Sequence, residues 1–107
     1  MEIIKCDNYK GWFVGDFQPN LLESKDLEFG YKRIIKGTKP DYHYHKFKTE
    51  FTILLEGSIL LEKTKKIIEP ISCIKLNPFE TNDQYFIEDC LILIINSPSV
   101  KNDKHLL

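Results

Sequence analysis

The chain has 107 residues, the length of one small domain with a modest hydrophobic core. Its 15 basic and 16 acidic side chains give a formal net charge of -1, which argues against a basic nucleic-acid binder. No apolar run approaches the length of a membrane-spanning helix, which is about 20 residues. The first residues lack the apolar core of an export signal. We therefore expect neither nucleic acid nor a membrane among its partners.

The three cysteines, Cys6, Cys73 and Cys90, are odd in number and form no C-x-x-C pair. This usage predicts free thiols in a reducing compartment, so we expect a cytoplasmic protein. Cys73 and Cys90 lie within apolar runs, and each is expected to be a small core residue.

Residues 1–25 are less regularly patterned than the rest of the chain and are expected to form an N-terminal arm. Within this arm, residues 12–17 suit either an edge strand or a lid. Trp12, Phe13 and Phe17 would form the lid, because aromatic side chains often cover small-molecule sites. Packing of these rings in the core or in a dimer is the alternative.

Residues 27–35 alternate with the period of two that indicates a half-buried strand. The odd positions are mostly apolar, including Leu27, Phe29 and Tyr31, and we expect them to face inward. The same face carries Arg33, the only arginine of the chain. Because a guanidinium binds a carboxylate or phosphate at two points, Arg33 is a candidate substrate anchor at a catalytic site. The alternative is a strand-end arginine that reaches solvent.

Further short strands are predicted along the rest of the chain, separated by turns rich in glycine, proline and asparagine. They span residues 41–47, 50–56, 59–62, 66–69, 71–76, 84–87 and 90–96. Many short strands with short turns indicate an all-β antiparallel sandwich or barrel, here as a single domain over residues 1–107. Residues 98–107 are expected to be a surface tail.

The tightest group of metal-binding side chains is His43, His45 and Glu50. Residues two apart in a strand point to the same face, so the two imidazoles project together. The four residues between His45 and Glu50 suit a turn that returns the carboxylate opposite the pair. Two imidazoles and one carboxylate leave positions open for water or substrate, as in non-haem iron and related divalent sites.

Gly37 and Gly57 frame this trio, and the spacing resembles the first motif of the cupin superfamily, G-(x)5-H-x-H-(x)3-4-E-(x)6-G. The resemblance implies a jelly-roll β-barrel, an antiparallel double-stranded β-helix. It also implies that His43, His45 and Glu50 hold a divalent metal in the barrel mouth, with Fe, Mn, Zn or Ni as candidates.

The second cupin motif is degenerate, since only Pro78 of its fixed positions remains. Alignment on this proline places Asp83 where the motif has its histidine ligand. Asp83 is thus a candidate fourth ligand, or a catalytic base if it does not bind the metal. A slip of one residue would bring Asn82 or Gln84 to the metal instead, and a three-ligand site is the remaining alternative.

Residues 11–17, 43–46 and 98–104 also resemble a group of small single-domain cupins that lack the second-motif histidine. This narrower resemblance supports the fold and leaves the reaction open. The resemblance to the first cupin motif implies a metal-binding protein that binds or transforms a small polar molecule, namely a sugar, nucleotide sugar or carboxylate. As an enzyme it would be a metal-dependent isomerase or lyase, or an oxygenase. The alternatives are a non-catalytic binding protein and a metal-free structural or interaction protein. Exposed-phase side chains, Ile34, Tyr42 and Tyr44, favour a homodimer.

Overall fold

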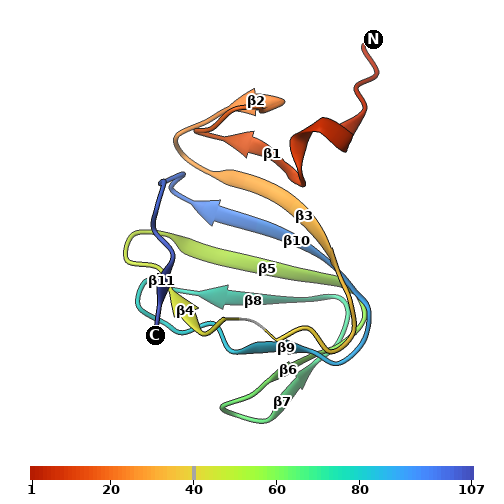
Figure 1. The fold of residues 1–107 in the computed structure, drawn as a ribbon, viewed down its shortest axis with the longest axis vertical. Coiled ribbons are helices and arrows are strands. Elements are labelled where there is room, and N and C mark those ends of the chain that lie inside the picture. The colour runs from red at the N-terminus through yellow and green to blue at the C-terminus, as the bar shows by residue number, and fades with distance from the viewer. Residues whose placement is uncertain (40) are drawn as a thin grey trace.

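The computed structural model describes residues 1–39 and 41–107, and most of them form short β-strands (Figure 1). The largest sheet has six strands in the order β2-β1-β3-β10-β5-β8. Its strands are β1 (Trp12–Gly15), β2 (Leu22–Glu23), β3 (Glu28–Ile34), β5 (Thr49–Glu56), β8 (Ser72–Leu76) and β10 (Cys90–Ser97). All of its pairings are antiparallel except that of β1 with β2.

Two smaller sheets form the opposite wall. One pairs β4 (His43–Tyr44) with β11 (His105–Leu106), and the other has the order β7-β6-β9, from β6 (Ile59–Leu61), β7 (Lys66–Ile68) and β9 (Gln84–Phe86). A bridge between His43 and Asn82 joins the two small sheets. The only helical element assigned to the described residues is a 3-10 turn, η1 (Cys6–Tyr9), and none of them forms a helix long and apolar enough to cross a membrane. The predicted all-β jelly roll is confirmed.

Strands β5 and β10 lie in the middle of the large sheet (Figure 1). Their outer faces are mostly apolar, and their inner faces are apolar over part of their length. Their inward side chains meet β6 and β9 of the opposite wall in one core, formed by Leu54, Ile59, Phe86, Cys90, Ile92 and Ile94. Cys90 is thus the small core residue expected, whereas Cys73 is exposed. The core fills one end of the space between the walls, and polar side chains line the rest.

The direction of the β3 side chains is opposite to the prediction. Glu28 and Lys32 line the interior cavity, whereas Arg33 lies on the outer side and does not line it. The odd, apolar positions instead pack with Phe13 on the outer face, where Phe13 stacks on Tyr31 with ring centroids 5.6 Å apart. The rule that apolar residues face inward fails here because this part of the interior is a polar cavity.

Both ends of the chain are more structured than predicted. The N-terminal arm adds β1 and β2 to the edge of the large sheet. The C-terminal segment is not a surface tail, because β11 pairs with β4 and two of its polar side chains, Ser99 and Asp103, are buried. These chain ends cover the interior at the edges of the two walls.

The glycines that frame the metal-binding motif differ in their surroundings and so provide a matched test. Both have positive φ, but a Cβ at Gly57 would lie 2.5 Å from the Asp89 carbonyl oxygen, while a Cβ at Gly37 would meet nothing within 4 Å. We predict that Gly57→Ala lowers the free energy of unfolding by about 1–3 kcal/mol more than Gly37→Ala does, through overpacking. Urea denaturation measures the difference, and equal losses would contradict the close packing at Gly57.

Candidate functional site

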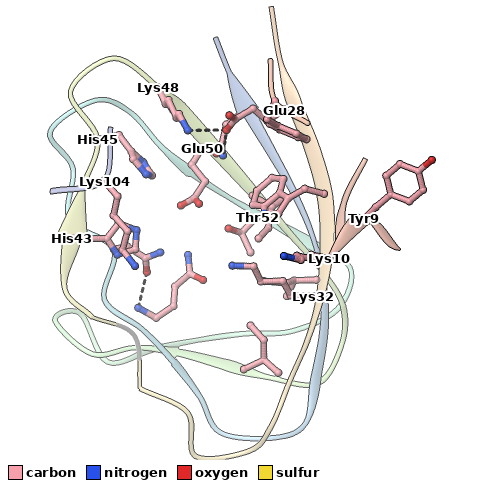
Figure 2. A pocket seen from close by; sticks show the side chains of 18 of the residues that line it. Tyr9, Lys10, Glu28, Lys32, His43, His45, Lys48, Glu50, Thr52 and Lys104 are labelled. Atoms are coloured by element: carbon pink, nitrogen blue, oxygen red, sulfur yellow. Dashed lines mark hydrogen bonds and ion pairs between the residues drawn. The ribbon is translucent and has the colours of Figure 1, made fainter. Parts of the chain in front are cut away.

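A cavity of about 550 Å³ opens between the two walls, and both polar and apolar side chains line it (Figure 2). The large sheet contributes alternate residues of β3, β10 and β5, whose register places them in rows. Glu28, Asn96 and Glu50 form one row across the three strands. Two rows further along, Lys32 lies beside Ile92, which belongs to the core. The cavity therefore has a polar floor that merges into the apolar core.

The two histidines line the cavity from the opposite wall (Figure 2). Their ring centroids are 5.4 Å apart. The Nδ1 atom of His43 lies 2.7 Å from the carbonyl oxygen of Asp41, which can only accept, so Nδ1 donates a proton to it and, in the neutral ring, Nε2 has the free lone pair. Burial, and then the neighbouring His43 and Lys48, lower the pKa of His45. Both features favour imidazole nitrogens that are free to donate to a metal.

Glu50 reaches into the same cavity from β5 and is buried. Its Oε2 atom has no hydrogen-bond partner among the described residues. Burial raises the pKa of Glu50, although the positive charges of His43, Lys32 and other cationic side chains oppose this. A buried carboxylate oxygen without a partner is costly unless something binds it. The environment of Glu50 is therefore the one expected of a carboxylate that binds a cation.

His43, His45 and Glu50 supply ligand atoms of the types that divalent ions bind. Two imidazoles and a buried carboxylate are common ligands of Zn, Mn, Fe and Ni. In the part of the chain that the structure describes, however, no three His, Cys, Asp or Glu side chains stand close enough together to hold an ion already. Binding through His43, His45 and Glu50 would thus require their side chains to rotate toward one another.

Asp83 does not take the place that the motif alignment gave it. Its Oδ2 atom accepts a hydrogen bond from the Lys63 backbone N–H at 2.7 Å, and it is absent from the lining of the main cavity. Asn82 and Gln84, its neighbours in the chain, line the cavity instead. Successive side chains of an extended segment point to opposite sides, so the two residues that a one-residue slip would bring to the metal lie on the cavity side. Neither the ligand role nor the base role of Asp83 is supported.

The position of Arg33 does not fit the predicted substrate anchor either, because Arg33 is exposed on the outer face of β3 and does not line the cavity. Lysines supply the positive charge there. Lys10, Lys32, Lys48 and Lys104 all line the cavity (Figure 2). The alternation along β3 could have indicated Lys32, one position before Arg33, if the even positions rather than the odd ones had been expected to face inward.

A buried ion pair at one side of the cavity was not predicted. The Lys48 Nζ atom lies 2.7 Å from the Glu28 carboxylate, and both side chains are largely buried. Asn96 Nδ2 and Ser99 Oγ donate to the same carboxylate at 2.9 and 3.0 Å. This network joins β3 to β10, to Ser99 beyond β10 and to the turn before β5, and both carboxylate oxygens of Glu28 accept hydrogen bonds.

Aromatic rings of the N-terminal arm flank the opening, in partial agreement with the predicted lid. Trp12 and Phe17 line the cavity and meet edge to face, with ring centroids 6.4 Å apart. The Lys32 ammonium lies 5.8 Å from the centre of the Trp12 ring. Phe13, the third ring of the predicted lid, faces outward instead.

The turn between His45 and Glu50 is held by the carboxylate of Asp103. This side chain is 2% exposed and accepts three backbone N–H groups, from Lys46, Phe47 and Lys48, each at 2.9 Å. Burial acts to raise the pKa of Asp103, but these hydrogen bonds and the His105 side chain outweigh it and lower the pKa. The C-terminal segment thus fixes the backbone that carries two of the candidate ligands.

Asp103 gives a prediction for acid stability. Its folded-state pKa is below the ordinary value, so its contribution is complete above about pH 4 and is lost as the pH falls through the folded-state pKa. Asp103→Asn should therefore lower the free energy of unfolding at pH 7 by about 2–3 kcal/mol and flatten its fall in acid. Urea denaturation from pH 2 to 7 measures both effects. The exposed Asp26→Asn is the control, and equal behaviour of the two variants would contradict the role of Asp103.

Comparison with known proteins adds information about the fold. No protein-family model matches the chain, and no curated protein matches it. Its structure is similar to that of KdgF from Halomonas sp., with a TM-score of 0.66 and 18% identity over 74% of this chain and 76% of that one. A double-stranded β-helix protein from Klebsiella pneumoniae gives a TM-score of 0.69 and 14% identity, over 97% of this chain and 89% of that one.

A cupin-2 domain protein from Shewanella frigidimarina is similar over 70% of this chain and 74% of its own, with a TM-score of 0.58 and 19% identity. At such identities the likeness concerns the fold rather than the reaction. It confirms the double-stranded β-helix that the first sequence motif implied.

Proposed function

The chain has the cupin fold, and we propose that it is a metal-binding cupin that binds or transforms a small polar molecule in its cavity. The proposal rests on His43, His45 and Glu50 lining one cavity, with the buried Oε2 atom of Glu50 lacking a partner. A divalent ion held there would supply Lewis-acid polarisation or an activated water. Fe, Mn, Zn and Ni remain the candidate ions.

The residues of the chain itself would orient the bound molecule and exclude water from it. Lys32 and Gln84 present donors to the cavity, and Trp12 and Phe17 present aromatic surface at its opening. A metal-dependent isomerase, lyase or oxygenase would use these groups to place the substrate, because positioning alone can supply much of a rate enhancement.

A non-catalytic binding protein is the second candidate. The observation in its favour is the position of Asp83, the predicted base, whose carboxylate is hydrogen-bonded to the Lys63 backbone outside the main cavity. Turnover of a bound molecule would identify an enzyme, and binding without turnover would identify a carrier or sensor.

The metal proposal predicts a selective loss of metal affinity. His45→Ala and Glu50→Gln should each weaken Zn²⁺ or Mn²⁺ binding at least about 100-fold, because even partners outside the ligand shell are worth about 10- to 100-fold. Calorimetric titration of metal-free protein, with elemental analysis of the reloaded protein, measures the loss. Glu56→Gln is the matched control, since Glu56 lies at the exposed end of the same strand. Unchanged affinity in the Glu50 variant would contradict the site.

We also propose a homodimer, formed through the outer face of the large sheet. Two of the three residues first expected at the interface have contacts within the chain, since Ile34 lines the cavity and Tyr44 stacks on Phe79 and His105. The outer face of the sheet carries a run of partly exposed apolar side chains, namely Phe51, Ile53, Leu93 and Ile95, beside Phe29 and Tyr31, on which Phe13 packs. Such a patch is typical of an interaction surface.

The dimer proposal predicts the effect of a charge placed on this face. Leu93→Lys should shift the protein toward the monomer in sedimentation velocity, because it would bury an unpaired charge at the interface. Ile67→Lys, on the exposed strand β7, should leave the oligomeric state unchanged. A monomeric wild-type protein at micromolar concentration would contradict the proposal.

The compartment we propose is the cytoplasm. The proposal is supported by Cys6, Cys73 and Cys90, which are all free thiols. Two of them are exposed, and exposed thiols persist most readily where the surroundings are reducing.

A further inference from the structure

Two residues that line the cavity, one from each wall, carry hydrogen-bond donors that lack acceptors. Gln84 is 3% exposed, and its Nε2 atom has no partner among the described residues. Lys32 lines the same cavity and appears in no ion pair or side-chain hydrogen bond of the described residues. A buried amide donor without a partner is costly, so an acceptor from outside the chain is expected beside it.

Basic side chains outnumber acidic side chains in the lining of the cavity. Four lysines and two glutamates line it, and the ion pair of Lys48 with Glu28 leaves three lysines facing one glutamate. Lys104 makes only a long contact of 4.0 Å with the exposed Asp41. The cavity therefore attracts an anion, and a bound divalent ion would strengthen that attraction.

A further residue of the lining carries an acceptor that lacks a donor. Asn96 is 5% exposed and donates its Nδ2 group to Glu28, while its Oδ1 atom has no partner among the described residues. Asn96 lies in the row of Glu28, four residues along β3 from Lys32, which corresponds to about 13 Å of strand. Side chains extend inward from both rows, so a short carbon chain can contact both.

The structure assigns a ligand class on these grounds, resting on the proposed function for the site itself. We propose that the cavity takes a small hydroxylated carboxylic acid. Its carboxylate pairs with Lys32 and accepts from Gln84 Nε2, and a hydroxyl group at its other end donates to Asn96 Oδ1. Trp12 and Phe17 pack against its carbon chain at the opening.

The ligand class is tested with three six-carbon probes that separate the two polar ends. D-gluconate has the carboxylate and the hydroxyl groups, D-glucitol has only the hydroxyl groups, and hexanoate has only the carboxylate. Calorimetric titration should show that gluconate binds at least about tenfold more tightly than either of the others. Its affinity should fall as salt is added, because the carboxylate pairs with a lysine in an open cavity.

Two variants test which residue contacts the carboxylate of the ligand and which contacts its hydroxyl group. Lys32→Met should weaken gluconate binding about tenfold or more and leave glucitol binding unchanged, while Asn96→Leu should weaken gluconate but not hexanoate. Lys66→Met, on exposed strand β7, is the control and should bind gluconate as the wild type does. Retained hexanoate binding shows that the Asn96 variant is folded.

The result that overturns the inference is gluconate binding no tighter than glucitol, or equal gluconate affinity in the Lys32 and Lys66 variants. Metal uptake is titrated separately on the same samples, and Lys32→Met should take up Zn²⁺ as the wild type does. Normal metal uptake without gluconate binding overturns the ligand class alone. Absent metal uptake with gluconate binding intact overturns the metal centre and supports the ligand class.

Discussion

The Asp103 carboxylate is the constraint on which the candidate site depends. It accepts the backbone N–H groups of three successive residues in the turn after His45, and it does so from a buried position. A turn of this kind would otherwise leave its amide groups to water, and His45 and Glu50 at its two ends would not be fixed. Because Asp103 lies between β10 and β11, the last residues of the chain become part of the architecture of the cavity.

The second determinant is that the barrel interior is divided between an apolar core and a polar cavity. Leu54, Ile92 and Ile94 close one part of the space, and Glu28, Glu50 and Asn96 line the other. The partly unsatisfied polar groups of the cavity lower the stability that the same volume of apolar packing would give. That cost is expected at a binding site, where an ion and a ligand complete the hydrogen bonding.

The sequence was sufficient for the strands, and in particular for β5, β8 and β10, because side-chain alternation and turn residues are local signals. It also predicted that His43, His45 and Glu50 share one space, since strand periodicity and the motif spacing agree. It failed for Arg33 and Asp83 for one shared reason. A shift of one position reverses which face a strand residue occupies, and only tertiary packing decides between the faces.

Other parts of the site had no local signal. Asp103 is more than fifty residues from the turn that it holds, and no pattern within either segment indicates the contact. Likewise, no local pattern indicates that Lys48 and Lys104 line the cavity. Such contacts arise from the way the barrel closes, which brings the C-terminal segment beside β4.

The metal centre that we propose consists of His43, His45 and Glu50, which together bind a divalent ion. The most direct measurement is X-ray absorption spectroscopy of the Zn²⁺-loaded protein. We predict a first shell of nitrogen and oxygen at about 2.0–2.2 Å, with outer-shell scattering from two imidazole rings that disappears when both histidines are replaced. A shell containing sulfur at about 2.3 Å, or one without imidazole scattering, would contradict the account.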